Sequence, residues 1–327
     1  MNQELQERCQ LFVENKNLLE KGFVWDGATI MPVCAMLYTQ DNRKVEVEKI
    51  KECRKLLKGK VGVFSGLRSY GEMVLLSKMA LTEDPADYLE KVLQAYALFK
   101  KYKLSEDAFT ALAAMLLVDH VDMNRWELTL EGAQRIYTRM KKEHPFLTGT
   151  EDVSFAILMA MSDLPEEWMM QEMEACYKAL HKKFGATDGL QSLSHVLAMD
   201  REETTKKCDA ILELDALFRG KKKKFDSNGI VMYGSLYMKQ LNREEMLDTI
   251  IEVDAYLKQQ KGFGVFSVDS YQRLMYATML VINQYDQGDS NMQMSMLNNV
   301  IAAIIAEYTA MLATMTVVMV ASTTANN

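Results

Sequence analysis

EHPFLTGTED, residues 143–152, places a histidine, a proline, a glycine, two threonines and three acids between two apolar runs. The segment has the features of a joint between two helices. Pro145 cannot continue a helix that ends before it, and Thr148 with Glu151 three residues later has the pattern of a capping box. We therefore predict that a helix starts at Thr148 and that the joint is structural.

The same layout recurs along the chain: an apolar residue, then Ser, Thr or Asp, then a helical run. Successive members are about 40 residues apart. These residue types at a helix start accept a hydrogen bond from a free backbone N–H, and the apolar residue before them, Phe146 or Leu147 in the opening stretch, can act as a hydrophobic staple. Seven first helices are predicted, with N-caps at Asp26, Ser65, Ser105, Thr148, Thr187, Ser227 and Ser267.

Each unit shows a second helix start about midway, with acids in the first turn and a proline at Pro85 and Pro165. Lysines follow the end of each second helix. Acids at N-termini and cations at C-termini both complement the helix dipole, which predicts one basic and one acidic edge. The second helices are predicted to close on apolar residues at Leu57, Phe99, Met140, Leu180, Phe218 and Leu257.

These patterns predict an all-α fold built from about seven antiparallel helical hairpins, each about 40 residues long. The preferred arrangement is an open, HEAT-like α-solenoid, and the alternative is a closed α/α toroid. Residues 1–25 are predicted to form an N-terminal helix and residues 26–287 the hairpin repeat domain. Residues 288–327 are predicted to form an apolar, Ala/Met-rich C-terminal helix and tail.

Composition indicates a globular protein. The 327 residues are 49% hydrophobic and carry a net charge of −7, which argues against a general nucleic-acid binder because such proteins need excess Lys and Arg. Five cysteines without a CxxC pair, and no apolar signal segment at the N-terminus, favour a cytoplasmic protein without disulfides. Cys53 and Cys176 lie on the predicted apolar stripes and are expected in the core.

Candidate functional residues are few. The four histidines show no metal-binding spacing, and the sequence contains no phosphate-binding loop and no nucleophile elbow. We therefore expect no metal, no cofactor and no assigned catalytic residue, and an enzyme is not favoured. The repeat pattern does not account for His144, with Asp152 nearby, or for Gln191 and His195 one unit later. These four residues are the candidate site.

The segment from Val300 to Val320 is apolar except for Glu307 and is long enough to span a bilayer. The central acid and the absence of flanking Lys or Arg argue against spanning. A packing or self-association helix is therefore preferred, and a peripheral or tail-anchored membrane contact is the alternative.

Several segments, among them HPFLTGTEDVSFAILMAMS and KGFGVFSVDSYQRLMYATMLV, resemble a mainly Gram-positive bacterial family known as domain of unknown function 4003. The resemblance implies no established catalytic residues. The second segment is also similar in rhythm to the α/α toroids of prenyltransferases and terpene cyclases. Two functions are therefore kept: a cytoplasmic scaffold that binds a protein or peptide, and an enzyme or small-molecule binder of the toroid type, with a pocket at the first-helix N-termini.

Overall fold

The computed structural model describes residues 1–104, 107–162, 164–239, 242–264 and 268–285. Over these residues the regular structure is entirely helical, which confirms the all-α prediction. The odd-numbered helices are α1 (Gln3–Gly22), α3 (Val47–Lys60), α5 (Pro85–Lys101), α7 (Trp126–Glu143), α9 (Glu166–Phe184), α11 (Thr204–Gly220) and α13 (Arg243–Lys258). The even-numbered helices are α2 (Met31–Gln40), α4 (Glu72–Leu81), α6 (Ala108–His120), α8 (Asp152–Met161), α10 (Asp188–Leu197), α12 (Val231–Met238) and α14 (Ser270–Tyr285). Short 3₁₀ helices are η1 (Ala28–Ile30), η2 (Gly66–Arg68) and η3 (Met123–Arg125).

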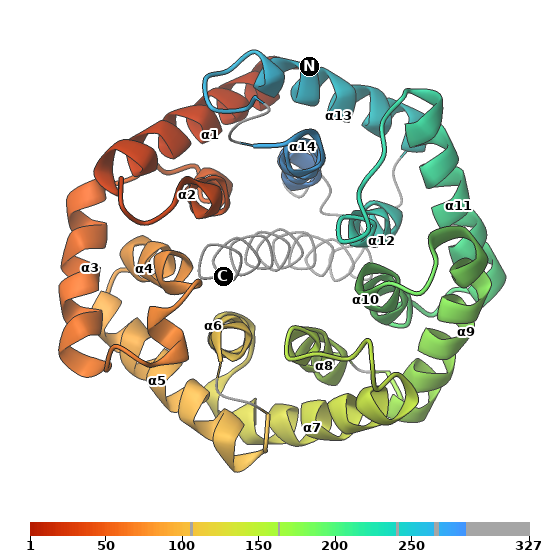
Figure 1. Cartoon of the computed structure of the whole chain (residues 1–327), viewed down its shortest axis with the longest axis horizontal. Coiled ribbons are helices and arrows are strands. Elements are labelled where there is room, and N and C mark those ends of the chain that lie inside the picture. Colours follow the sequence, from red (N-terminus) through yellow and green to blue (C-terminus); the bar gives the residue numbers. More distant parts are fainter. Residues whose placement is uncertain (105–106, 163, 240–241, 265–267, 286–327) are drawn as a thin grey trace, which may run out of the picture.

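The helices form two concentric layers, with the even-numbered helices inside the odd-numbered ones (Figure 1). The two ends of the described chain meet: α1 contacts α13 and α14, and α14 contacts α2. The hairpins therefore follow one another around a ring, which is the alternative arrangement and not the preferred open array. The predicted N-terminal helix is α1, which packs mainly on α2 as an outer helix of this ring.

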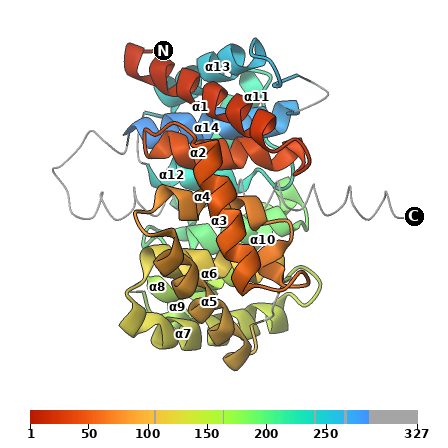
Figure 2. The ribbon, with the colours of Figure 1, turned by 90° about the vertical axis from the view of Figure 1, so that its left-hand side faces the viewer.

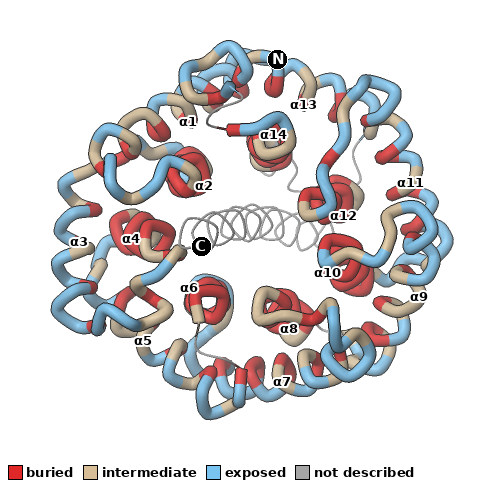
Figure 3. Tube along the Cα trace, viewed as in Figure 1, coloured by how far each residue is buried: buried red, intermediate tan, exposed pale blue. Residues whose placement is uncertain are grey.

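The division into layers follows from the distribution of apolar residues. The inner helix α6 is apolar on all sides, and its side chains from Ala108 through Leu117 are all buried (Figure 3). The outer helix α7 buries one stripe, which includes Leu130, Ile136 and Met140, and exposes its other face. A helix apolar on every side must lie inside, whereas an amphipathic helix can cover it. The predicted second helices are the outer helices. The six residues predicted to close them are all fully buried: Leu57, Phe99, Met140, Leu180, Phe218 and Leu257.

The joints that lead from an outer helix into the next inner helix differ in part from the prediction. Thr187 does cap α10, since its hydroxyl accepts from the N–H of Leu190. The capping box at Thr148 is wrong: α8 begins at Asp152, and the Thr148 hydroxyl instead accepts a hydrogen bond from Gln191. The caps predicted at Asp26, Ser65 and Ser227 are also wrong, because α2 begins at Met31, α4 at Glu72 and α12 at Val231. Ser65 caps the short helix η2 instead. Ser105 and Ser267 lie outside the described residues.

The predicted hydrophobic staple at Phe146 is wrong as well, since this side chain is almost fully exposed. The apolar residue that comes soon after the outer helix is the one that packs in most joints. In the joints after α1 and α3, the apolar residues that follow it are exposed: Val24, Trp25, Val63 and Phe64. The buried residues at this place are Phe23, Val61, Leu104, Phe225 and Phe263.

Ion pairs connect neighbouring outer helices around the ring, which Figure 2 shows edge-on. Lys60 at the end of α3 pairs with Glu90 of α5, and Lys101 at the end of α5 pairs with Glu127 of α7. Some lysines of the predicted basic edge are therefore neutralised by acids of the next outer helix. The prediction of two oppositely charged edges stays a prediction.

All five cysteines are buried thiols, as expected for Cys53 and Cys176. Among the helices within the described ranges, none combines the length and apolarity that crossing a bilayer requires. The predicted C-terminal helix and tail, including Val300 to Val320, lie outside the described residues.

Candidate functional site

Three of the four predicted site residues meet between the inner helices α8 and α10. Asp152 is the first residue of α8, and Gln191 and His195 lie four residues apart on one face of α10. His195 Nδ1 is 3.7 Å from Asp152 Oδ1, too far for a hydrogen bond. Gln191 Nε2 donates to Thr148 Oγ1 at 2.8 Å, so the joint before α8 belongs to the same cluster.

The cluster is buried and incompletely paired. His195 is 0% exposed, and neither of its ring nitrogens has a hydrogen-bond partner. Gln191 Oε1 is also buried without a partner. Since a buried polar group without a hydrogen bond costs about 1–3 kcal/mol, such groups in a folded protein indicate either strain or a function.

Burial changes the protonation of both ionisable groups. It raises the pKa of the Asp152 carboxyl well above its ordinary value, with a further contribution from the negative charge of Glu151. It lowers the pKa of His195 to about 3. Both shifts favour the uncharged form, so the pair is a carboxylic acid facing a neutral imidazole whose lone pair can accept a proton or a hydrogen bond.

Carboxyl groups from three successive joints lie at the starts of α6, α8 and α10. Asp107 caps α6, Glu151 precedes α8, and Asp188 begins α10. Burial and then the charges of Asp188 and Asp107 raise the pKa of Glu151. The pKa of Tyr137 is raised by burial and then by the charges of Asp152, Glu151 and Asp107. We call Asp107, Glu151, Asp152 and Asp188 the carboxyl cluster; of these, Asp152 was a predicted site residue and Glu151 was predicted only as part of a capping box.

The structure turns His144 away from this cluster. Its ring lies 4.6 Å from that of Tyr177, and its Nε2 is 2.8 Å from Glu174 Oε2, both on α9. Burial opposes ionisation of Glu174, but hydrogen bonds from Lys178 and His144 lower the pKa of this carboxyl overall. His144 therefore joins α7 to α9 and is not brought together with Asp152.

We expect His144→Ala to leave the fold intact and to lower the free energy of unfolding by about 1 kcal/mol or less, because the ion pair that it removes is partly exposed. Chemical denaturation measures the change. His181→Ala is the matched control, since His181 also stacks on Tyr177 but is exposed. Loss of cooperative unfolding in the His144 variant alone would mean that the joint depends on this residue.

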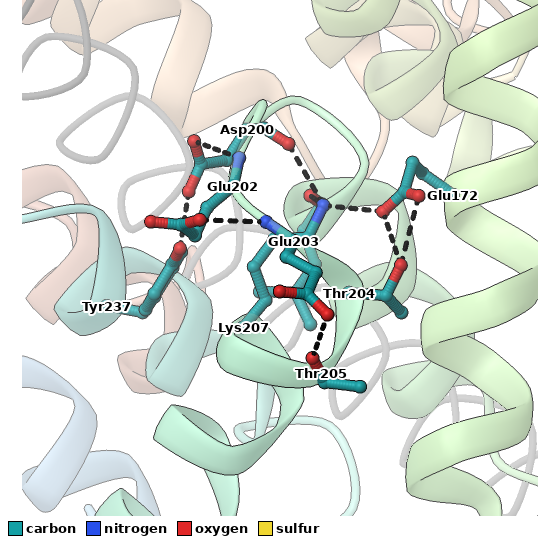
Figure 4. A network of polar contacts seen from close by, with 9 residues as sticks. Glu172, Asp200, Glu202, Glu203, Thr204, Thr205, Lys207 and Tyr237 are labelled. Atoms are coloured by element: carbon teal, nitrogen blue, oxygen red, sulfur yellow. Dashed lines mark hydrogen bonds and ion pairs between the residues drawn. The ribbon is translucent and has the colours of Figure 1, made fainter.

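A second polar network, which sequence analysis missed, lies at the opposite ends of the inner helices (Figure 4). Lys207 of α11 is fully buried and donates to Glu172 Oε2 at 2.8 Å, to the Asp200 carbonyl at 2.9 Å and to the Leu197 carbonyl at 3.0 Å. Tyr237 of α12 donates to the Asp200 carboxylate. All three ammonium donors of Lys207 therefore have acceptors, which indicates a structural tie between α9, α10, α11 and α12.

A sequence signal for Lys207 did exist. It precedes Ile211 by four residues and Leu214 by seven, so it lies on the apolar stripe of its helix. A lysine there must either reach the surface or find buried acceptors. Its neighbour Lys206 lies off the stripe and is mostly exposed.

The two networks differ in what remains unpaired. The Lys207 ammonium group is fully paired, whereas the α8–α10 cluster keeps free acceptors beside mutually repelling acids. Over the described ranges, no three His, Cys, Asp or Glu side chains converge as they would around a metal ion. The α8–α10 cluster is thus the better candidate for a functional site.

Comparison with known proteins agrees with the resemblance in the sequence. The family model described as "Protein of unknown function (DUF4003)" matches residues 15–310. The chain belongs to the DUF4003 family. This DUF4003 chain is also similar to the uncharacterized protein YeaA of Bacillus subtilis (strain 168), with 22% identity over 273 residues that cover 80% of this chain and 81% of that protein. No solved structure matches.

Proposed function

We propose that the protein binds a small, positively charged organic molecule at the ends of α6, α8 and α10 where these inner helices begin. The observation that carries the proposal is the unpaired, fully buried His195 beside Asp152, a member of the carboxyl cluster. Asp107, Glu151 and Asp188 would meet the charged part of the ligand. Gln191 and His195 would accept hydrogen bonds from its donor groups.

The carboxyl cluster favours a cation for an electrostatic reason. The negative charges of Asp107 and Asp188 raise the pKa of Glu151, and those of Glu151 and Asp188 raise the pKa of Asp152, which means that these charges destabilise one another. A bound cation would relieve this repulsion and favour ionised carboxylates. An anion would add to the repulsion.

The neutral imidazole favours a ligand with N–H groups. A buried His195 with its pKa lowered to about 3 stays uncharged at neutral pH and offers one lone pair. Gln191 Oε1 offers a second acceptor from the same face of α10. A primary or secondary amine has both the charge and the donors that this arrangement lacks.

The preferred sequence-based function, a scaffold for a protein or peptide, stays a prediction. It depended on the concave surface of an open array, whereas the hairpins form a ring. The ring instead supports the alternative, a small-molecule binder with its site at the first-helix N-termini.

Thermal denaturation with putrescine, spermidine or succinate tests the proposal. We expect the two amines, and not the dianion, to raise the Tm at low ionic strength. Glu151→Gln with Asp188→Asn should weaken amine binding about tenfold, equivalent to about 1.4 kcal/mol. Glu202→Gln with Glu203→Gln is the matched control, since it makes the same charge change at the opposite ends of the inner helices. An equal loss in both variants, or no response to either amine, would refute the proposed site.

A further inference from the structure

Three large aromatic side chains on the joints are almost completely exposed. Trp25 is 97% exposed, Phe64 100% and Phe146 99%. Val24 and Val63, directly beside the first two, are also exposed. Isolated exposed apolar residues are ordinary on a protein surface, but recurring aromatic residues at one place in a repeat indicate a surface with a partner.

These residues share one face of the ring. Each lies on a joint that leads from the end of an outer helix to the start of an inner helix: α1 to α2, α3 to α4, and α7 to α8. Because outer and inner helices alternate around the ring, all such joints lie at the same face, which is turned toward the viewer in Figure 1 and edge-on in Figure 2. We call this the joint face.

The same joints carry exposed lysines, because the outer helices end there. The exposed lysines from α1 to the α7–α8 joint include Lys21, Lys58, Lys103 and Lys142. Lys60 and Lys101 on this arc pair with acids of the next outer helix. Two acids beside the aromatic residues are paired: Asp26 with Arg54, and Glu143 with Arg139.

The charge pattern selects the partner. Aromatic side chains flanked by lysines on one face are the pattern of proteins that lie on a membrane surface, where the rings enter the headgroup region and the lysines meet anionic lipids. A second copy of this chain would bring lysine against lysine. The acids of the carboxyl cluster lie at the starts of the inner helices, whereas these lysines lie at or just after the ends of the outer helices. The negative and positive charges therefore lie in different layers of the ring.

We propose that the joint face binds to anionic membrane surfaces, with Trp25, Phe64 and Phe146 entering the headgroup region of the bilayer. This inference is independent of the amine site. It needs no transmembrane helix, since the contact is made by loops between helices.

The test uses the full-length chain and vesicles of phosphatidylcholine with or without phosphatidylglycerol. We expect co-sedimentation with the anionic vesicles and little with pure phosphatidylcholine. The variant Trp25→Ser, Phe64→Ser, Phe146→Ser should bind the anionic vesicles at least tenfold more weakly. The control variant Met123→Ser, Leu128→Ser removes two exposed apolar side chains at the opposite face and should bind as the wild type does.

Tryptophan fluorescence gives a second readout, because Trp126 is buried and Trp168 is partly buried, whereas Trp25 is exposed. The part of the emission that Trp25→Phe removes should be that of a water-exposed indole without lipid, and it should shift to shorter wavelength with anionic vesicles. Three outcomes would overturn the proposal. The first is no binding to anionic vesicles, and the second is undiminished binding by the triple variant, which would assign the contact to another segment. The third is blue-shifted Trp25 emission without lipid, which would mean that this chain or a second copy covers the face.

Discussion

Lys207→Ala is expected to lower the free energy of unfolding by about 3–5 kcal/mol, the usual cost of removing one partner of a buried ion pair. The substitution removes the donor for Glu172 Oε2 and for the carbonyls of Leu197 and Asp200. These carbonyls lie at the end of α10 and in the loop after it. The last carbonyl groups of a helix have no hydrogen-bond donor within the helix and need donors from elsewhere. Urea denaturation followed by circular dichroism measures the loss.

The adjacent residue provides the control. Lys206 has the same side chain on the same turn of α11, but it is 64% exposed and pairs only with Glu202. Lys206→Ala should change the free energy of unfolding by no more than about 0.5 kcal/mol. Similar losses in the two variants would show that the buried network of Lys207 does not hold α9 to α12 together.

His195 is expected to make the fold sensitive to acid, at a cost of about 3 kcal/mol between pH 6.5 and pH 4. The unfolded chain binds a proton at this histidine below its ordinary pKa of 6.5, whereas in the folded chain the pKa is about 3. In this window the unfolded state therefore holds one more proton, and stability falls as the pH falls. The slope is about 1.4 kcal/mol per pH unit.

Comparison with His195→Leu isolates this contribution, because carboxylates elsewhere in the chain also titrate in acid. The variant should lose less stability than the wild type between pH 6.5 and pH 4. Denaturant midpoints of both proteins across this range give the difference. Parallel pH profiles would mean that His195 gains its proton in the folded state as readily as in the unfolded chain.

Much of the fold could be predicted from local patterns. The six apolar residues predicted to close the second helices are all in the core, because a period of 3.6 residues determines which face of a helix is buried. The ring could not be predicted this way. Its closure depends on contacts of α1 with α13 and α14. A repeat pattern gives neither the rotation from one hairpin to the next nor the total rotation that brings the two ends of the chain together.

The candidate site was only partly predictable for a related reason. Asp152 and His195 were predicted as site residues because the repeat pattern did not explain them. The distance of 3.7 Å between His195 Nδ1 and Asp152 Oδ1 depends on how far α10 is shifted along α8. His144, next to the same joint, points to Glu174 instead. Phe146 or Leu147 was predicted as a staple, and nothing local in the sequence shows which of the two lies closer to the core; Phe146 is exposed and Leu147 is partly buried.

Proton release on amine binding tests whether a cation binds at the carboxyl cluster. Isothermal titration of spermidine into the protein near pH 6, in two buffers with different ionisation enthalpies, measures the protons released per ligand. A cation next to the carboxyl cluster lowers the raised pKa values of Glu151 and Asp152, so the account predicts release, diminished in Asp152→Asn. Binding heat that is the same in both buffers, or no saturable heat at all, would contradict it.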